Sequence, residues 1–234
     1  MLTASPRPAR SAARGGVSRG VSLIELMVGL AVSLIVVGGA LSMMVRIQTT
    51  SWRLLIETRL NQDLRAAADL MARDLRRSGY WGNAIQGALA QGVGSVAAQN
   101  PYRALSGSTA DGLAYRFSRD AVENNALDAT EQFGFRLHDG VLQMQLTSGV
   151  WQNLTDDKNV LVTALAVTPT LTALPIGNLC SKPCTAGTPN CPVSTVRSLA
   201  ITLTGQSVRD SAVVRSTALT VRVRNDEFSG QCPT

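Results

Sequence analysis

The sequence predicts an α+β protein in which one long N-terminal helix packs on an antiparallel β-sheet. An almost uncharged apolar run near the N-terminus continues into a stripe of apolar residues at helical spacing. In the second half, several short segments alternate between apolar and polar residues, which is typical of strands with one buried face. An Asp139-Gly140 pair stands between two of these segments and favours a tight hairpin turn.

Residues 1–20 are rich in Pro, Arg, Ala, Ser and Gly and have no apolar period, so we expect an unstructured leader. The leader has no acidic residue and four basic ones: Arg7, Arg10, Arg14 and Arg19. Because basic residues before an apolar span stay in the cytoplasm, the C-terminal part is expected outside it. Without the leader, 18 of the 22 basic residues remain against 16 acidic ones, so the net charge does not indicate nucleic-acid binding.

Residues 21–45 are predicted to form a hydrophobic transmembrane helix. From residue 26 to residue 45 the only polar side chains are Ser33 and Ser42, and about twenty residues at a rise of ~1.5 Å span roughly 30 Å, the thickness of a bilayer core. Glu25 lies at the start of this run, where a carboxylate costs about 2.5–3.5 kcal/mol. A simple anchor does not need this residue, so Glu25 calls for a functional explanation.

Residues 46–79 are predicted to continue the same helix as an amphipathic segment, giving one helix over residues 21–78. Its apolar stripe consists of Ile56, Leu60, Leu64, Ala67, Met71 and Leu75. Arg73, Arg76 and Arg77 suit the negative end of the helix dipole, and Gly79 can take the left-handed position after the last turn. We interpret Asp74, Arg76 and Arg77 as a capped, solvated helix end.

Residues 80–234 are predicted to form a β-rich globular domain. A long connection over 82–112, with a helical turn near 84–90, precedes the strands. The expected strand segments are 113–117, 133–137, 142–146, 151–154, 160–167, 199–203 and 219–223. We expect them to form a single antiparallel sheet, covered on its apolar face by the amphipathic half of the helix. An insertion at 175–194 interrupts the strands.

The four cysteines are Cys180, Cys184, Cys191 and Cys232, all on the expected exported side. An even number in an oxidising compartment favours disulfides, but the sequence does not choose among the three pairings. We hypothesise that one bond joins Cys232 to the insertion and restrains the C-terminal tail. A metal site is the alternative, yet structural zinc uses close Cys/His pairs, and the sole histidine, His138, is far away in sequence.

Other chemistry has little support in the sequence. Two groups of loop carboxylates could suggest calcium, but their spacing matches no EF-hand loop, so we expect solvated charges. The first group is Asp120, Glu123, Asp128 and Glu131, and the second is Asp156 and Asp157. The sequence contains no nucleophile elbow, zinc-protease motif or phosphate-binding glycine loop. We therefore expect a protein that is not an enzyme and that uses no metal or cofactor.

Gly20 and the ten residues after it, VSLIELMVGL, closely resemble the class III signal of type IV pilins and pseudopilins. The resemblance implies that a prepilin peptidase cuts between Gly20 and Val21, that Val21 is N-methylated, and that Glu25 is the assembly glutamate. A cut after Gly16 would put Val21, rather than an acid, at the fifth mature position. Val21 departs from the phenylalanine usual in the family, and the leader is long for it.

A second resemblance narrows the prediction. Residues 72–82, ARDLRRSGYWG, are similar to the helix-end motif of PilW-type minor pilins, and residues 221–225, VRVRN, to the last strand of PilW-type pilins and of the pseudopilin GspJ. The resemblance implies a pilin-like fold and a non-enzymatic minor pilin that helps to start type IV pilus assembly at the tip. Adhesion and twitching motility would follow from the pilus.

The resemblance also implies a location and partners. The chain would be a single-pass inner-membrane protein, in contact with membrane lipid, before it enters the pilus. Its partners would be the prepilin peptidase, other minor pilins, the major pilin, the inner-membrane assembly platform and a tip adhesin, with no direct contact to nucleic acid. The alternatives are a GspJ-like pseudopilin of a type II secretion system and a membrane-anchored periplasmic binding protein or enzyme. A signal peptide cut near residues 38–40 is a further alternative.

Overall fold

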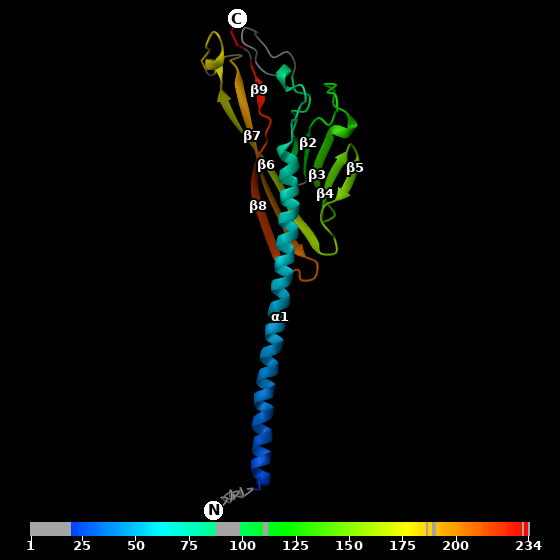
Figure 1. Ribbon diagram of the computed structural model, residues 1–234, viewed down its shortest axis with the longest axis vertical. Coiled ribbons are helices and arrows are strands. Elements are labelled where there is room, and N and C mark those ends of the chain that lie inside the picture. Colours follow the sequence, from blue (N-terminus) through cyan, green and yellow to red (C-terminus); the bar gives the residue numbers. More distant parts are fainter. Residues whose placement is uncertain are drawn as a thin grey trace, which may run out of the picture. The chain divides into compact units, whose positions relative to one another are not determined.

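The computed structural model describes residues 20–87, 99–109, 112–185, 187–188, 191–230 and 232–233 of the 234-residue chain. The leader expected over residues 1–20 therefore lies outside the described residues except for Gly20. The chain divides into two compact units, Met1–Ser51 and Trp52–Thr234. The fold class is the predicted α+β, with one long N-terminal helix and antiparallel sheets (Figure 1).

The helix α1 (Leu23–Arg76) has 54 residues and includes both the apolar run and the amphipathic stripe. Its bounds lie within two residues of the predicted 21–78. In the first unit its apolar side chains are exposed, and the segment is long and apolar enough to cross a membrane. The hydroxyls of Ser33 and Ser42 donate to the carbonyls of Leu30 and Gly39 at 2.9 and 2.8 Å, so both polar groups are satisfied within the helix.

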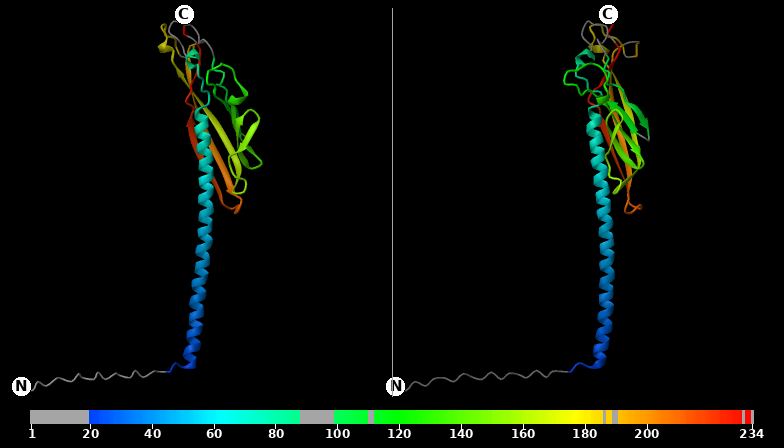
Figure 2. Two further views of the ribbon diagram at one scale, coloured as in Figure 1. Left: turned by 45° about the vertical axis from the view of Figure 1, so that its right-hand side comes forward. Right: turned by 90° about the vertical axis from the view of Figure 1, so that its right-hand side faces the viewer.

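In the second unit the amphipathic part of α1 covers the core. The buried residues Leu60, Leu64, Met71 and Leu75 follow the predicted apolar stripe. They pack with strand residues that are equally buried: Leu113, Tyr115, Phe135, Leu142, Leu165, Leu199, Ile201 and Leu203. Figure 2 shows earlier strands of the globular domain, coloured green, and later strands, coloured yellow to red, running along this part of α1.

The described strands form two sheets rather than the single sheet expected. The first contains β1 (Ser106–Thr109), β2 (Gly112–Arg116), β3 (Gln132–His138), β4 (Val141–Thr147) and β5 (Val150–Asn153), in that order. The second contains β6 (Val160–Pro175), β7 (Val193–Ser207) and β8 (Val214–Arg222), with β9 (Glu227–Ser229) paired to β7. A turn around Asp156, whose carbonyl accepts the Val160 N–H at 2.9 Å, connects β5 to β6, which belong to different sheets.

The turn residues predicted the local structure correctly, although the single sheet was wrong. Asp139 and Gly140 have φ values of 50° and 75°, which confirms the tight turn predicted between β3 and β4. The short helix η1 (Ala84–Gly87) lies within the predicted helical turn, while residues 88–90 lie outside the described chain. The remaining short helices are η2 (Ala129–Glu131) and η3 (Gly177–Leu179).

Candidate processing and assembly site

The junction of Gly20 and Val21 lies just before α1. These residues and Ser22 are exposed, and the helix begins at Leu23. The carbonyl of Ser22 accepts the Leu26 N–H at 3.1 Å, so the first helical turn is complete. A peptide bond in an exposed segment that precedes a rigid helix is open to a processing enzyme.

Glu25 is the acidic residue of the first turn of α1. Negative charge at a helix N-terminus is favourable, and residues four apart lie on one face of a helix. A new amine at Val21 would therefore lie within about one turn of this carboxylate. Among the described residues Glu25 forms no ion pair, so it is free to pair with such an amine.

The first unit presents an extended apolar surface around Glu25. Leu23, Ile24 and Leu26 are 76 %, 70 % and 58 % exposed, and the apolar residues continue to Ile47. At Gly29, Gly38 and Gly39, no atom apart from the helix's own backbone lies within 4 Å of the position a Cβ would take. Small residues in an apolar helix allow another helix to approach closely, so this surface suits lipid or other helices.

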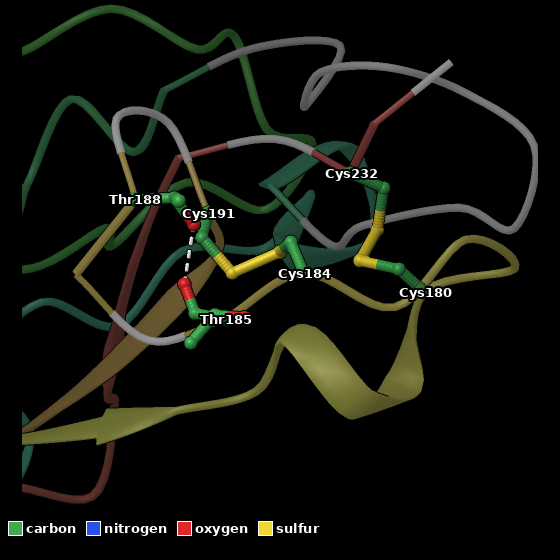
Figure 3. The surroundings of a disulfide bond; sticks show 6 residues. All are labelled: Cys180, Cys184, Thr185, Thr188, Cys191 and Cys232. Carbon is green, nitrogen blue, oxygen red and sulfur yellow. Dashed lines mark hydrogen bonds between the residues drawn. A yellow bond between two sulfur atoms is a disulfide. The ribbon is translucent and has the colours of Figure 1, made fainter.

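The cysteine region lies at the end of the β6–β7 hairpin (Figure 3). Cys180 is bonded to Cys232 across a sequence separation of 52 residues, and Cys184 to Cys191 across 7. Cys232 is thus joined to the 175–194 insertion, the form of bond hypothesised from the sequence. The hydroxyl of Thr188 donates to the Thr185 carbonyl inside the smaller loop. With all four sulfurs in disulfides, none is available as a metal-binding thiolate.

Two of the four loop carboxylates between residues 120 and 131, Glu123 and Glu131, differ from the solvated charges expected, whereas Asp128 is exposed as expected. Glu131 is fully buried, and its two oxygens accept the N–H groups of Arg119 and Asp128 at 3.0 and 2.9 Å. Glu123 accepts the Gly82 N–H and the Tyr102 hydroxyl, both at 2.9 Å. Burial alone would raise the pKa of Glu123, but the hydrogen bonds it accepts lower it below its usual range. Glu123 thus ties the loop to the chain after α1, and Glu131 holds the two ends of the loop together.

The end of α1 is also less solvated than expected. Asp74 is buried, forms an ion pair with Arg77, and accepts the Tyr115 hydroxyl of β2 at 3.1 Å. Burial, followed by the charge of Asp74, raises the pKa of Tyr115 well above its ordinary value. His138, in contrast, is exposed beside the β3–β4 turn, 3.5 Å from Asp139.

Arg197 of β7 is buried, which the sequence did not predict. Its guanidinium donates to the carbonyls of Arg103 and Asn225 at 2.5 and 2.8 Å. Burial lowers its pKa, against the opposing charges of Glu227 and Asp226. Nothing in the alternating pattern of β7 distinguishes it from an exposed arginine, so sequence reasoning had no signal for it.

A membrane-length apolar helix with a carboxylate in its first turn, followed by an amphipathic stretch packed on antiparallel sheets, defines a type IV pilin-like protein. The prokaryotic N-terminal methylation motif matches residues 17–41, which include Gly20, Val21 and Glu25. The family described as prepilin peptidase-dependent protein B matches residues 53–223, more than half of the chain, and the chain belongs to this family. Comparisons with curated proteins and with solved structures gave no match.

Proposed function

We propose that the chain is a non-enzymatic, PilW-like minor pilin that takes part in starting type IV pilus assembly at the tip. In this proposal the prepilin peptidase cuts between Gly20 and Val21, and Val21 is then N-methylated. The observation that carries the proposal is Glu25, a carboxylate in the first turn of an exposed apolar helix and within the methylation motif.

The proposed mechanism is pairing of charges between subunits. Cleavage creates a cationic amine at Val21, and the Glu25 carboxylate of the same or a neighbouring subunit pairs with it. In an apolar bundle such a pair is more useful for register than for stability, because desolvation of both charges offsets most of their attraction. The pair would therefore fix the axial offset of each incoming helix.

The location and partners follow from this mechanism. Before assembly the chain would cross the inner membrane once, with the leader in the cytoplasm and residues 80–234 in the periplasm. It would then join other minor pilins and the major pilin through the assembly platform, and support a tip adhesin. The apolar helix would set assembly, and the globular domain would set the choice of partners.

Substitution of Glu25 tests the proposal. We expect Glu25→Ala to leave cleavage after Gly20 intact but to lower recovery in sheared filaments by roughly tenfold, the effect of about 1.4 kcal/mol. Ser33→Ala is the matched control, because the Ser33 hydroxyl donates to the Leu30 carbonyl of its own helix and so is satisfied without a neighbouring subunit. Normal piliation together with normal recovery of Glu25→Ala would contradict the proposal.

A GspJ-like pseudopilin of a type II secretion system is the second candidate. It is favoured by residues 221–225, VRVRN, which resemble the last strand of that pseudopilin. Both candidates share the helix and the peptidase, so deletion of the gene separates them. Loss of surface pili supports the minor pilin, whereas loss of protein secretion with normal pili supports the pseudopilin.

A further inference from the structure

A groove of about 440 Å³ lies at the C-terminal end of α1 in the second unit. Three segments line it. The end of α1 contributes Arg76, Arg77 and Tyr80, the chain after β2 contributes residues 117–119, and the chain after β8 contributes Arg224 and Asn225. The groove therefore gathers residues that are far apart in the sequence.

Backbone hydrogen bonds hold these three walls together. The Ser118 N–H donates to the Tyr80 carbonyl at 2.9 Å, and the Arg224 N–H donates to the Arg76 carbonyl at 3.1 Å. The side-chain amide of Asn225 adds a bond of 3.1 Å to the Ser78 carbonyl. These bonds fix the backbone positions of the groove-lining arginines. The arginine side chains are not needed to hold the walls together and are available to bind a ligand.

The groove is positive and its charge is largely uncompensated. Four arginines line it, and no carboxylate does. Arg77 alone has a carboxylate partner, Asp74, and its guanidinium lies 4.7 Å from the centre of the Phe117 ring. Arg76, Arg119 and Arg224 are exposed and form no ion pair with any residue that the structure describes.

The helix dipole explains only part of this cluster. Cations near a helix C-terminus are stabilised by the last carbonyls, which accounts for Arg76 and Arg77. Arg119 and Arg224 belong to other segments and lie outside the last turn of α1. The Arg119 guanidinium lies 5.8 Å from the centre of the Phe133 ring, but this contact does not neutralise its charge. Gathering like charges in one groove is unfavourable. An anionic ligand that neutralises the groove explains why all four arginines gather there.

We propose that this groove docks an acidic segment of a neighbouring subunit, with its carboxylates on the arginines; the inference rests on the proposed function. The planar guanidinium matches a carboxylate through two parallel hydrogen bonds. Tyr80, which lines the groove and is 51 % exposed, supplies the aromatic contact typical of protein interfaces.

The charge balance favours a protein segment over a nucleic acid. Outside the leader the chain has 18 basic and 16 acidic residues, so the positive charge at this groove is local. A long polyanion is held by many phosphate contacts along an extended basic surface. One groove with four arginines instead fits a short run of aspartate or glutamate.

The test is binding of a fluorescent hexaglutamate peptide to the full chain in detergent, measured by anisotropy. We expect Arg76→Glu/Arg224→Glu to weaken binding by roughly tenfold or more. The matched control is Arg65→Glu/Arg209→Glu, which makes the same charge change at two exposed arginines outside the groove. Both variants keep the Asp74–Arg77 pair, and thermal unfolding of each checks that it is folded.

Three outcomes would overturn the inference. They are equal peptide affinity in the groove variant, an equal loss in the control variant, and tighter groove-dependent binding of a hexathymidine oligonucleotide than of the peptide. The proposed function fails separately, if the mature chain does not begin at Val21 or if Glu25→Ala enters filaments normally. If the chain fails those two tests but still binds the peptide through these arginines, the groove is a binding site for acidic peptides and the proposed role in pilus assembly is wrong.

Discussion

Buried polar side chains fix the end of α1 on the first sheet. The Asp74 carboxylate and the Tyr115 hydroxyl form a hydrogen bond in which both groups are removed from solvent. Such a bond is worth more than an exposed one, because breaking it removes the partner of Oδ2 of a buried carboxylate whose other oxygen is paired with Arg77. The position of the helix end, and with it one wall of the arginine groove, therefore depends on Tyr115.

Tyr115→Phe should lower stability at neutral pH by about 1–2 kcal/mol, because it leaves Asp74 with one hydrogen bond fewer. Burial raises the pKa of Tyr115 in the folded chain, so the phenol stays neutral above its ordinary value of about 10. The unfolded chain loses that proton above roughly pH 10, so stability is full below this pH and falls above it. The variant lacks this proton and should lose stability less steeply there.

Chemical denaturation at neutral pH and between pH 9 and roughly pH 11 measures both effects. The pKa of Tyr102 is also raised in the folded chain. Part of the loss of stability with rising pH should therefore remain in the Tyr115→Phe variant. Tyr80→Phe, at a ring that is half exposed, should leave stability at neutral pH nearly unchanged. Identical slopes above pH 10 in wild type and Tyr115→Phe would contradict this account.

At the scale of elements, the sequence predicted the helix and the turn whose formation depends on residues close together in the chain. The apolar stripe located α1, and the Asp139-Gly140 pair located the β3–β4 turn, because both depend on neighbours in the chain. The distal part of β6, residues 168–175, is exposed on both faces and is ordered by pairing with β7. Its alternation carries no burial signal, so the strand was predicted only as far as residue 167.

Pairing between distant segments could not be predicted for the same reason. β9 has three residues, and the division into two sheets depends on which strands meet in space. Of the candidate functional residues, Gly20, Val21 and Glu25 lie within a stretch of six residues and form a motif that can be recognised in the sequence. The arginine groove joins three separate segments, so only the structure brings its residues together.

Gly79 ends α1 in a conformation that other residues resist. Its φ is 73°, and an added Cβ would lie 2.6 Å from Nη2 of Arg197. Gly79→Ala should therefore cost backbone strain of about 1–2 kcal/mol and a further penalty for displacing Arg197. Gly149→Ala is the matched control, since its φ is 77° but no atom lies within 4 Å of its Cβ position.

Thermal unfolding of both glycine variants separates the two effects. The control should show the backbone strain alone, and Gly79→Ala should lose about 1 kcal/mol or more beyond it. Equal losses would mean that the contact with Arg197 has no energetic consequence and that the turn alone requires glycine.

The two disulfides should differ in what they stabilise. Loop entropy assigns about 4 kcal/mol to a bond that closes 52 residues and about 2 kcal/mol to one that closes 7. The Cys180–Cys232 bond also restrains the chain just after β9, which is too short to pair stably alone. Replacing Cys180 and Cys232 by serine should therefore release β9, whereas replacing Cys184 and Cys191 should not.

Hydrogen exchange of the β9 amides, read by mass spectrometry, measures this release. We expect protection of residues 227–229 to be lost in the first double variant and kept in the second. Unchanged protection in both variants would show that pairing with β7 holds β9 without the covalent bond.

At the scale of the whole molecule, the two units divide the proposed work. The first unit has the proposed processing junction, Glu25 and an apolar surface with no buried residue among those described. The second unit has a complete core, two disulfides and the arginine groove. Processing should thus be controlled by the sequence around residue 20 and should leave the membrane segment in the mature chain.

Gly20→Leu tests this division. Because glycine has no side chain, a protease can approach its backbone closely, and a leucine at this position should block the cut. We expect the variant to be a precursor that keeps its leader and stays in the membrane. The wild-type chain should start at a methylated Val21. It should also stay in the membrane, because residues 26–45 remain in the mature chain. Intact-mass measurement of membrane fractions washed with alkaline carbonate distinguishes the two forms.

Gly16→Leu is the control, because it leaves the Gly20–Val21 junction unchanged and should be processed normally. If Gly16→Leu blocks processing instead, the cut lies after Gly16, Val21 becomes the fifth residue, and Glu25 loses its position one turn from the new amine. A wild-type chain that starts near residues 38–40 and is washed from the membrane would identify a secretory signal peptide. The carboxylate at Glu25 would then be removed with the leader, and no role in assembly would remain for it.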